Sequence, residues 1–270
     1  MHYLNHKDEG KENYMSIKLD MSKAFDRVEW KFIHEVMVKM GFAKKWVDLI
    51  INYISSVSYL VIINGEPCGN IIPSRGIRQG DPLFPYLFLL CAESLSTLIH
   101  KTARDKQING ISIGRGCPIL THLFFTNDSL LFCKVKVQEC QKLVDILNSY
   151  EAASGQKINT DKSFVFFSSN TPQERKESIL NILGPMQDSR HNKYLGLPTI
   201  IGKSKAQVVA EVKERVAKKL AGWKGKLLSI GGREILIKAI AQAMPTYTMS
   251  CFQLPKTLCK DLENLMRNFW

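Results

Sequence analysis

Hydrophobic and polar positions follow two different periods along this chain, and the pattern changes near residue 200. Before that point, segments that alternate or are rich in β-branched residues favour strands, while an apolar residue at every third or fourth position favours helices. We predict strands over residues 15–19, 57–63, 119–125, 130–133 and 164–167, and helices over residues 30–40, 43–54, 83–99, 137–153 and 172–183. Beyond Gly202 the pattern is helical, and we predict amphipathic helices over residues 206–220, 230–243 and 258–269.

Two pairs of predicted strands are joined by turn residues. Asn64-Gly65 is a strong hairpin signal, because both residues tolerate a left-handed backbone. Residues 126–129 separate two apolar runs and predict a second hairpin. We therefore predict an α+β fold, with an antiparallel sheet packed on helices over residues 15–200. A polar tail over residues 1–14 precedes it, and a basic helical region over residues 201–270 follows.

Composition limits the setting in which this chain works. Its 270 residues, 45% of them hydrophobic, suffice for one large domain or two smaller ones. No apolar run reaches the length of about 18 residues that a membrane span needs, and no signal peptide is visible, so we predict an intracellular protein without a membrane partner. The seven cysteines are scattered, which predicts buried free thiols with no disulfide partner and makes a zinc site improbable.

The net charge of +12 is unevenly distributed. Residues 200–270 hold thirteen Lys and Arg against five Asp and Glu, a local net charge of +8. Such an excess favours a polyanionic partner such as a nucleic acid. A solubilising surface explains the charge alone equally well.

Three aspartates stand where apolar segments end. Asp20 follows a predicted strand, Asp26 comes six residues later, and Asp128 falls in the second predicted turn. Carboxylates close to an apolar core repel each other, and a divalent cation that also binds phosphate oxygens would stabilise them. The alternative is structural, because Asn127-Asp128 is also an ordinary turn sequence and Asp20 could cap the next segment.

A second concentration of polar residues lies between Ser74 and Leu83. Asp81 and Pro82 predict a helix start with Asp81 as the N-cap residue. Two arginines and two glycines precede it, a combination suited to a phosphate or a nucleic-acid backbone. A well-capped helix after a turn, without any ligand, explains the same residues.

Read in order, these segments resemble the motifs of reverse transcriptases from LINE-type (non-LTR) retrotransposons, in particular those of plant genomes. The segments that carry the resemblance are KLDMSKAFDRVEW (18–30), RGIRQGDPLFPYLFLLCAESLS (75–96), HLFFTNDSLLFC (122–133), SGQKINTDKS (154–163), KYLGLP (193–198) and the region 222–255. The resemblance implies a polymerase palm over residues 15–200 and a thumb-like region over residues 201–270. It also implies that the fingers are largely missing, as in an open reading frame cut from a decayed element.

The resemblance also implies a catalytic centre for template-directed addition of deoxynucleotides. Asp20 and Asp128, with the backbone carbonyl of Met21, would bind two Mg²⁺ ions, and Lys162 would approach the leaving phosphates. Phe25 would exclude a ribose 2′-hydroxyl. The nucleotide-binding residues would be Arg78, Gln79 and Gly80, and the primer grip would be Tyr194, Leu195 and Gly196. The implied partners are an RNA template, a DNA primer and dNTPs, and a functional copy would act in the nucleus.

One position departs from the family's pattern in a way that bears on activity. Where the family has the first aspartate of a metal-binding pair, this chain has Asn127. An amide carries no charge, so we predict weakened metal binding and a rate lowered roughly 10³-fold or more. Restoring the aspartate alone would then help only modestly, since the fingers are missing. The alternatives are an RNA- or DNA-binding relic without polymerase activity, and a relic without function; the oligomeric state stays open.

Overall fold

The computed structural model describes residues 4, 12–114, 116–125, 128–188, 193–194, 197–198, 206–224, 227–251 and 253–270. Residues 3–189 form one compact unit and residues 190–270 a second one. The predicted boundary at residue 200 lies outside the described residues, so the domain limits stay a prediction. Among the described residues, no helix is both long and apolar enough to cross a lipid bilayer.

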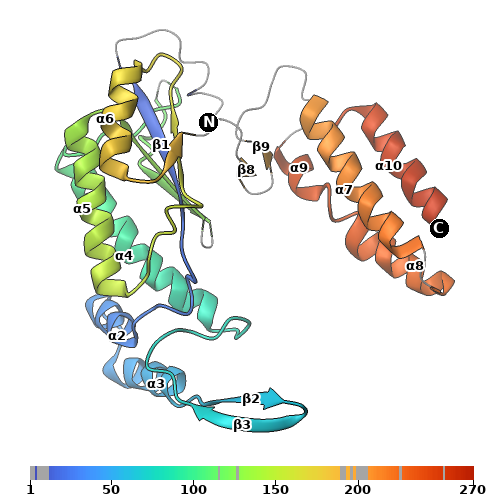
Figure 1. Cartoon of the computed structure of the whole chain (residues 1–270), viewed down its shortest axis with the longest axis horizontal. Coiled ribbons are helices and arrows are strands. Elements are labelled where there is room, and N and C mark those ends of the chain that lie inside the picture. The colour runs from blue at the N-terminus through green and yellow to red at the C-terminus, as the bar shows by residue number, and fades with distance from the viewer. Residues whose placement is uncertain are drawn as a thin grey trace. The chain divides into compact units, whose positions relative to one another are not determined.

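The first unit is built on a five-stranded sheet with the strand order β4-β5-β1-β6-β7 (Figure 1). Its strands are β1 (Tyr14–Asp20), β4 (His122–Phe125), β5 (Asp128–Lys134), β6 (Phe164–Phe167) and β7 (Gln187–Asp188). Strand β1 pairs antiparallel with both β5 and β6, and β4 pairs antiparallel with β5, whereas β7 joins β6 in parallel. The predicted α+β fold with a mainly antiparallel sheet is confirmed.

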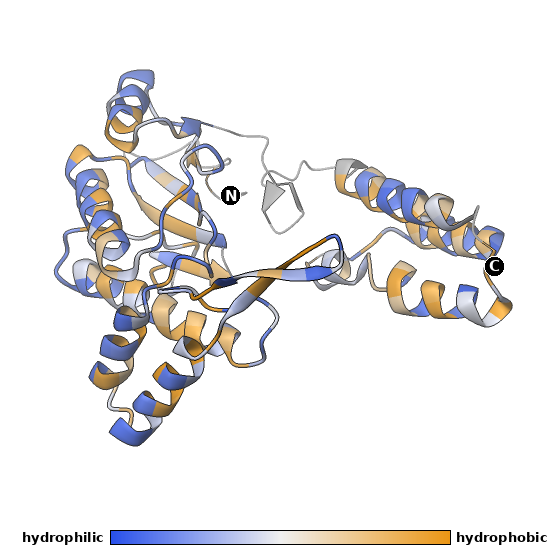
Figure 2. Ribbon diagram, turned by 60° about the horizontal axis from the view of Figure 1, so that its bottom comes forward, coloured by the Kyte–Doolittle hydropathy of each residue, from blue (hydrophilic) through white to orange (hydrophobic). Residues whose placement is uncertain are grey.

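The two faces of β1 have different surroundings, as the period of two along a strand requires. Met15, Ile17 and Leu19 are all 0% exposed and belong to the main hydrophobic core. The helices of this unit are α2 (Trp30–Lys39), α3 (Lys44–Ser55), α4 (Phe84–Arg104), α5 (Val137–Ser154) and α6 (Gln173–Leu183), and each of them contributes apolar side chains to that core. Figure 2 colours the ribbon by hydropathy and shows hydrophobic residues along helices and strands alike. Lys18 and Asp20 therefore lie on the opposite face of the sheet.

The hairpin of β2 (Tyr59–Ile63) and β3 (Glu66–Ile71) forms a separate two-stranded sheet, visible as the ribbon below α3 in Figure 1. Asn64 and Gly65 both have positive φ angles, of 53° and 89°, so the predicted hairpin turn is confirmed. Every residue of both strands is exposed.

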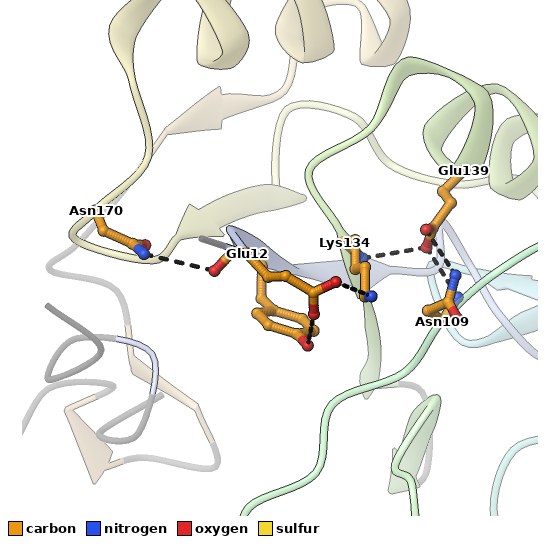
Figure 3. A network of polar contacts seen from close by, with 6 residues as sticks. Glu12, Asn109, Lys134, Glu139 and Asn170 are labelled. Atoms are coloured by element: carbon orange, nitrogen blue, oxygen red, sulfur yellow. Dashed lines mark hydrogen bonds and ion pairs between the residues drawn. The ribbon is translucent and has the colours of Figure 1, made fainter. Parts of the chain in front are cut away.

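Two carboxylates anchor the ends of β1 and β5 (Figure 3). Glu139 is only 4% exposed, and it accepts hydrogen bonds from the backbone N–H of Asn109 (2.8 Å), the side-chain amide of Asn109 (2.9 Å) and the backbone N–H of Lys134 (3.2 Å). Glu12 accepts from the Lys134 ammonium and from the Tyr14 hydroxyl (2.8 Å). These bonds reinforce the register between β1 and β5.

The cysteines correct one expectation. Cys91, Cys133 and Cys140 are buried, and burial raises the pKa of Cys91 and of Cys140 to about 12. Cys68, Cys117 and Cys251 are exposed, so the prediction that the free thiols are buried is wrong for these three. Free cysteine is among the most often buried residues, so nothing in the sequence indicated that these three are exposed.

The regular elements described in the second unit are helices, together with the short pair β8 (Lys193–Tyr194) and β9 (Leu197–Pro198). Its helices are α7 (Ala206–Lys224), α8 (Ile230–Leu236), the π-helical turn η1 (Ile237–Ala241), α9 (Thr246–Cys251) and α10 (Lys256–Phe269). Its own core contains Val212, Val216, Leu220, Ala241, Leu258, Leu262 and Phe269. The helix predicted over 230–243 is present as α8 and η1, which follow each other without a break and differ in that η1 is π-helical.

Candidate active site

Asp20 and Asp128 face each other across the sheet. They form the last pair in the register between β1 and β5, so the strand pairing that starts at Tyr14 and Lys134 ends on two carboxylates. Directly paired residues of antiparallel strands project to the same face with Cβ atoms about 5 Å apart. The predicted meeting of Asp20 with the tip of the second hairpin is therefore present in the fold.

Lys18 compensates part of this negative charge. Its Nζ lies 3.1 Å from Oδ1 of Asp128, and the two side chains are only 14% and 21% exposed. The same ammonium group lies 5.7 Å from the centre of the Phe164 ring. Lys18 precedes Asp20 by two residues and so projects from the same face of β1. Sequence reasoning missed this residue, although its period-two spacing from Asp20 was visible.

Strand β5 begins earlier than predicted. Strand β4 ends at Phe125 and β5 begins at Asp128, so Asp128 lies in a strand and not in a turn. Residues 126 and 127, which connect the two strands, lie outside the described residues. Because Asp128 pairs with both Phe125 and Asp20, the strand and not the turn sets its position.

The segment 157–163 wraps around the end of β1. The Asp20 N–H donates to Oγ of Ser163 (3.0 Å), and the Asp20 carbonyl accepts from the N–H of Asn159 (2.8 Å). Met21 forms an isolated β-bridge with Ile158. Lys162 sits in the same turn with an exposed side chain. The segment 154–163 is thus brought next to the segment 18–30, as the resemblance implied. The role of Lys162 stays a prediction.

Gln156 holds the other side of this loop in place and is 1% exposed. Its amide nitrogen donates to the Ala24 carbonyl (2.9 Å), and its amide oxygen accepts from the Tyr150 hydroxyl. A buried amide with both ends bonded rigidifies its surroundings. Nothing in the sequence indicated that Gln156 would hold this loop, beyond its presence in the segment 154–163.

The glycine-containing segment after the first hairpin is bound to the Phe25 loop by main-chain contacts. Gly76 N–H donates to the Val28 carbonyl (2.8 Å), and Ile77 N–H donates to the Phe25 carbonyl (2.9 Å). The Trp30 indole donates to the Gly76 carbonyl (2.7 Å). The Phe25 ring is partly buried against Phe88, with ring centres 4.7 Å apart.

Arg78, Gln79 and Gly80 are exposed, as a binding role requires. Arg78 and Gln79 line a cavity of about 290 Å³, and Asp26 and Phe84 also contribute to its wall. The structure therefore places the predicted nucleotide-binding segment beside the loop that follows Asp20. The binding role of its residues stays a prediction.

The helix after this segment begins later than predicted. Helix α4 starts at Phe84 with Leu83 as its N-cap residue, so Asp81 is not the N-cap. Instead the Asp81 carboxylate accepts from the Leu83 N–H (2.9 Å) and from the Tyr53 hydroxyl (2.5 Å). The Tyr53 hydrogen bond lowers the pKa of Asp81, and the same bond raises the pKa of Tyr53.

The predicted primer grip belongs to the second compact unit. Tyr194 ends β8, while Leu195 and Gly196 lie outside the described residues. The structure therefore does not test whether these three residues approach Asp20.

The donor set suits a divalent cation only in part. Asp20 and Asp128 are hard oxygen ligands on one face, which Mg²⁺ prefers. No group of three His, Cys, Asp or Glu suited to a metal occurs among the described residues. Two carboxylates offset by one ammonium leave a net charge of −1, so the residues fit a cation with reduced electrostatic attraction.

Comparison with known proteins agrees with this geometry. The family model described as reverse transcriptase (RNA-dependent DNA polymerase) matches residues 2–199. The chain therefore belongs to the reverse transcriptase family, whose members are RNA-directed DNA polymerases that use divalent metal ions.

The relatives narrow this assignment to the LINE-type (non-LTR) branch. The chain is 24% identical over 94% of its length to a 149 kDa protein of transposon TX1 from Xenopus laevis. It is 28% identical over 58% of its length to a Pol polyprotein of the type-2 retrotransposable element R2DM from Drosophila melanogaster. The chain spans only 19% and 14% of the lengths of these two proteins.

Solved structures support the fold. Telomerase from Candida tropicalis, in complex with a fragment of telomeric RNA, is similar with a TM-score of 0.51 and 13% identity, over 92% of this chain and 41% of that chain. Telomerase from Candida albicans gives a TM-score of 0.50 with 13% identity, over 98% and 46% of the two chains. At this identity the likeness shows the palm and thumb fold alone.

Proposed function

We propose that this chain is the polymerase region of a non-LTR retrotransposon reverse transcriptase whose own catalysis is weak. The observation that carries the proposal is the Asp20–Asp128 pair, on which the central strand pairing ends. The segments 154–163 and 75–96 lie against Asp20 and the loop that follows it. Asn159 N–H donates to the Asp20 carbonyl, and Ile77 N–H donates to the Phe25 carbonyl. Membership of the reverse transcriptase family supplies the reaction class.

In this proposal each group has one task. Asp20, Asp128 and the Met21 carbonyl would hold Mg²⁺, which supplies electrostatic stabilisation of the phosphoryl oxygens. Lys162, exposed on the adjoining turn, would donate a proton to the leaving phosphates or neutralise part of their charge. The substrates would be dNTPs on a DNA primer paired with an RNA template, and the reaction on chromosomal DNA would take place in the nucleus.

The exposed segment 78–80 would receive the incoming nucleotide beside Phe25. The aromatic contact between Phe25 and Phe88 restrains the ring, since its centre lies 4.7 Å from that of Phe88. A restrained ring can exclude a 2′-hydroxyl sterically, whereas a mobile one would move aside.

Weak catalysis follows from the local charge. Asn127 supplies no charge, and the Lys18 ammonium already binds Asp128, so within the described part of the chain Asp20 is the carboxylate of the pair that forms no ion pair. Phosphoryl transfer of this kind relies on metal ions and positioning. A site with fewer charges holds those ions less tightly, which lowers the rate.

The same ion pair favours a second candidate function, which is nucleic-acid binding without polymerisation. A carboxylate neutralised by Lys18 no longer repels a phosphate backbone, and residues 200–270 carry a net charge of +8. Binding by charge needs no metal.

Primer extension on a primed RNA template with dNTPs and Mg²⁺ distinguishes the two candidates. We expect slow extension by the natural chain and about tenfold faster extension by Asn127→Asp, equivalent to about 1.4 kcal/mol. Adding Lys18→Gln to Asn127→Asp should increase the rate further, because Asp128 is then released. Adding Asp20→Asn instead should abolish extension and serves as the control.

Two outcomes would contradict the polymerase proposal. If the natural chain extended the primer as fast as the Asn127→Asp variant, the charge at position 127 would not limit catalysis. The Asn127→Asp variant could instead show no template-dependent extension while it still binds the primed template in a filter-binding assay. That result would support the binding function alone.

A further inference from the structure

The helical unit contains a cationic hollow with an apolar floor. Its volume is about 450 Å³, and its lining is Arg215, Lys218, Lys219, Gly222 and Trp223 from α7 together with Met244, which follows η1. Positions 215, 218, 219 and 222 have the i, i+3, i+4, i+7 spacing of one helix face. Most of the lining therefore lies on one stripe of α7, the long helix labelled in Figure 1.

The cations of this stripe differ from neighbouring cations of the same unit in their ion pairs. Lys213, on another face of α7, binds Asp261 at 2.7 Å, and Lys238 binds Glu234 at 2.6 Å. Within the described part of the chain, no ion pair joins Arg215, Lys218 or Lys219 to a carboxylate. Exposed cations left without partners favour an anionic ligand.

The floor of the hollow combines open space with an aromatic ring. A Cβ at Gly222 would have no atom within 4 Å, so this helical glycine leaves open space above the α7 backbone. Trp223 is half-buried and its ring is steadied by Phe269, with centres 5.9 Å apart. Lys219 Nζ lies 5.8 Å from the centre of the Trp223 ring.

We infer that this hollow binds one unpaired nucleotide of a single-stranded nucleic acid. Arg215 and Lys218 hold its phosphates, and the base lies over Gly222 against Trp223 and Met244. Aromatic stacking beside a cationic groove is the general way in which proteins bind unpaired bases. A base within a duplex would not fit, because pairing covers one of its edges and the neighbouring base pairs stack on both of its faces. The inference rests on the proposed nucleic-acid partner and adds a site to it.

The test compares two ligands of equal charge on the full chain. Fluorescence anisotropy measures binding of a labelled single-stranded oligonucleotide and of its abasic counterpart. We expect Trp223→Ala to weaken binding of the normal oligonucleotide about tenfold. The same substitution should leave binding of the abasic one nearly unchanged. Equal losses for both ligands would overturn base stacking and indicate a site for any acidic chain.

Gly222→Ala is a second variant, which tests the same site if Trp223→Ala unfolds the helical unit. It adds a methyl group to the open space, so we expect weaker binding of the normal oligonucleotide without a lower melting temperature. The double substitution Arg215→Ala with Lys218→Ala should reduce the slope of log affinity against log salt by about 1.4. Lys213→Ala is the matched control, because that cation lies outside the hollow, and it should have a smaller effect.

Failure of this inference differs from failure of the proposed function. If Gly222→Ala and the double substitution bind like the natural chain while the natural chain still retains an RNA–DNA hybrid, the hollow is not a site and the proposed function stands. If the natural chain retains neither ligand at low salt, the nucleic-acid partner itself is wrong.

Discussion

His122 on β4 shows how the interior sets the chemistry of a single side chain. Its Nδ1 lies 3.0 Å from Oγ1 of Thr121 and its Nε2 lies 3.0 Å from Oγ of Ser96, so each ring nitrogen has a hydroxyl partner. The ring contacts Phe124 and His100, with centres 4.6 Å and 4.7 Å away. Desolvation, and secondarily the neighbouring His100, lowers the pKa of His122 to about 4. The ring is therefore neutral at physiological pH.

This shift predicts a pH dependence of stability. Between pH 6.5, the ordinary pKa of histidine, and pH 4, the unfolded chain binds a proton at His122 that the folded protein does not bind. Acidification through this window should therefore lower the free energy of unfolding, and above it His122 should have no effect. Partial exposure of the ring screens the effect below the full shift.

The measurement is urea unfolding from pH 7 to pH 4 for the natural chain and for His122→Gln. We expect the difference between their unfolding free energies to shrink as the pH falls, since glutamine does not titrate. A difference that stays constant across the window would show that the ring is not desolvated as described.

At the scale of elements, the candidate site is assembled by loops that touch through their main chains. Gly76 has a φ of +88°, and a Cβ there would lie 2.7 Å from the Asp26 carbonyl oxygen. Gly155, after α5, has a φ of +75° and would lie 2.6 Å from the Arg27 carbonyl oxygen. Both contacts fall on the loop between Asp20 and Trp30. Glycine is therefore required where the segments 75–96 and 154–163 meet the segment 18–30.

Gly76→Ala should consequently disturb the site more than an ordinary glycine substitution. We expect a loss of about 3 kcal/mol in unfolding free energy, from left-handed strain together with the clash. Gly80→Ala is the matched control, because its φ is +94° but its Cβ would meet nothing within 4 Å. That control should cost about 1 kcal/mol. Equal losses in urea unfolding would mean that the contact with Asp26 is not close.

At the scale of the whole molecule, each compact unit has its own hydrophobic core. The core of the first unit spreads over the sheet and five helices, and includes Leu143 of α5 at 1% exposure. The core of the helical unit is smaller and includes Leu258 of α10, also at 1% exposure. A substitution in one core removes contacts from that unit only.

We expect Leu258→Ala to destabilise the helical unit by about 2–5 kcal/mol. Hydrogen exchange resolved by peptide should then show faster exchange over residues 206–270, while residues 128–188 keep their protection. Leu143→Ala is the reciprocal variant and should have the opposite distribution. Loss of protection over both regions in both variants would show that the two units unfold as one.

The sequence alone determined much of this protein, because local patterns decide local structure. Hydrophobic periods located the strand that became β6 (Phe164–Phe167) without error, and Asn64-Gly65 located the hairpin turn. The order and spacing of the motifs identified the family, since such an ordered set does not arise by chance. The replacement of an expected aspartate by Asn127 was also legible from sequence, and it carries the proposal of weak activity.

Only the tertiary structure decided which side chains meet. The pairing of Asp20 with Asp128 depends on a register between residues more than a hundred positions apart, and a slip of one residue would send Asp128 to the other face. The same register brings Lys18 to Asp128 and so changes the charge of the site. Local propensities contain no term for such contacts, because a carboxylate in a strand acquires its partner only when the strands pair.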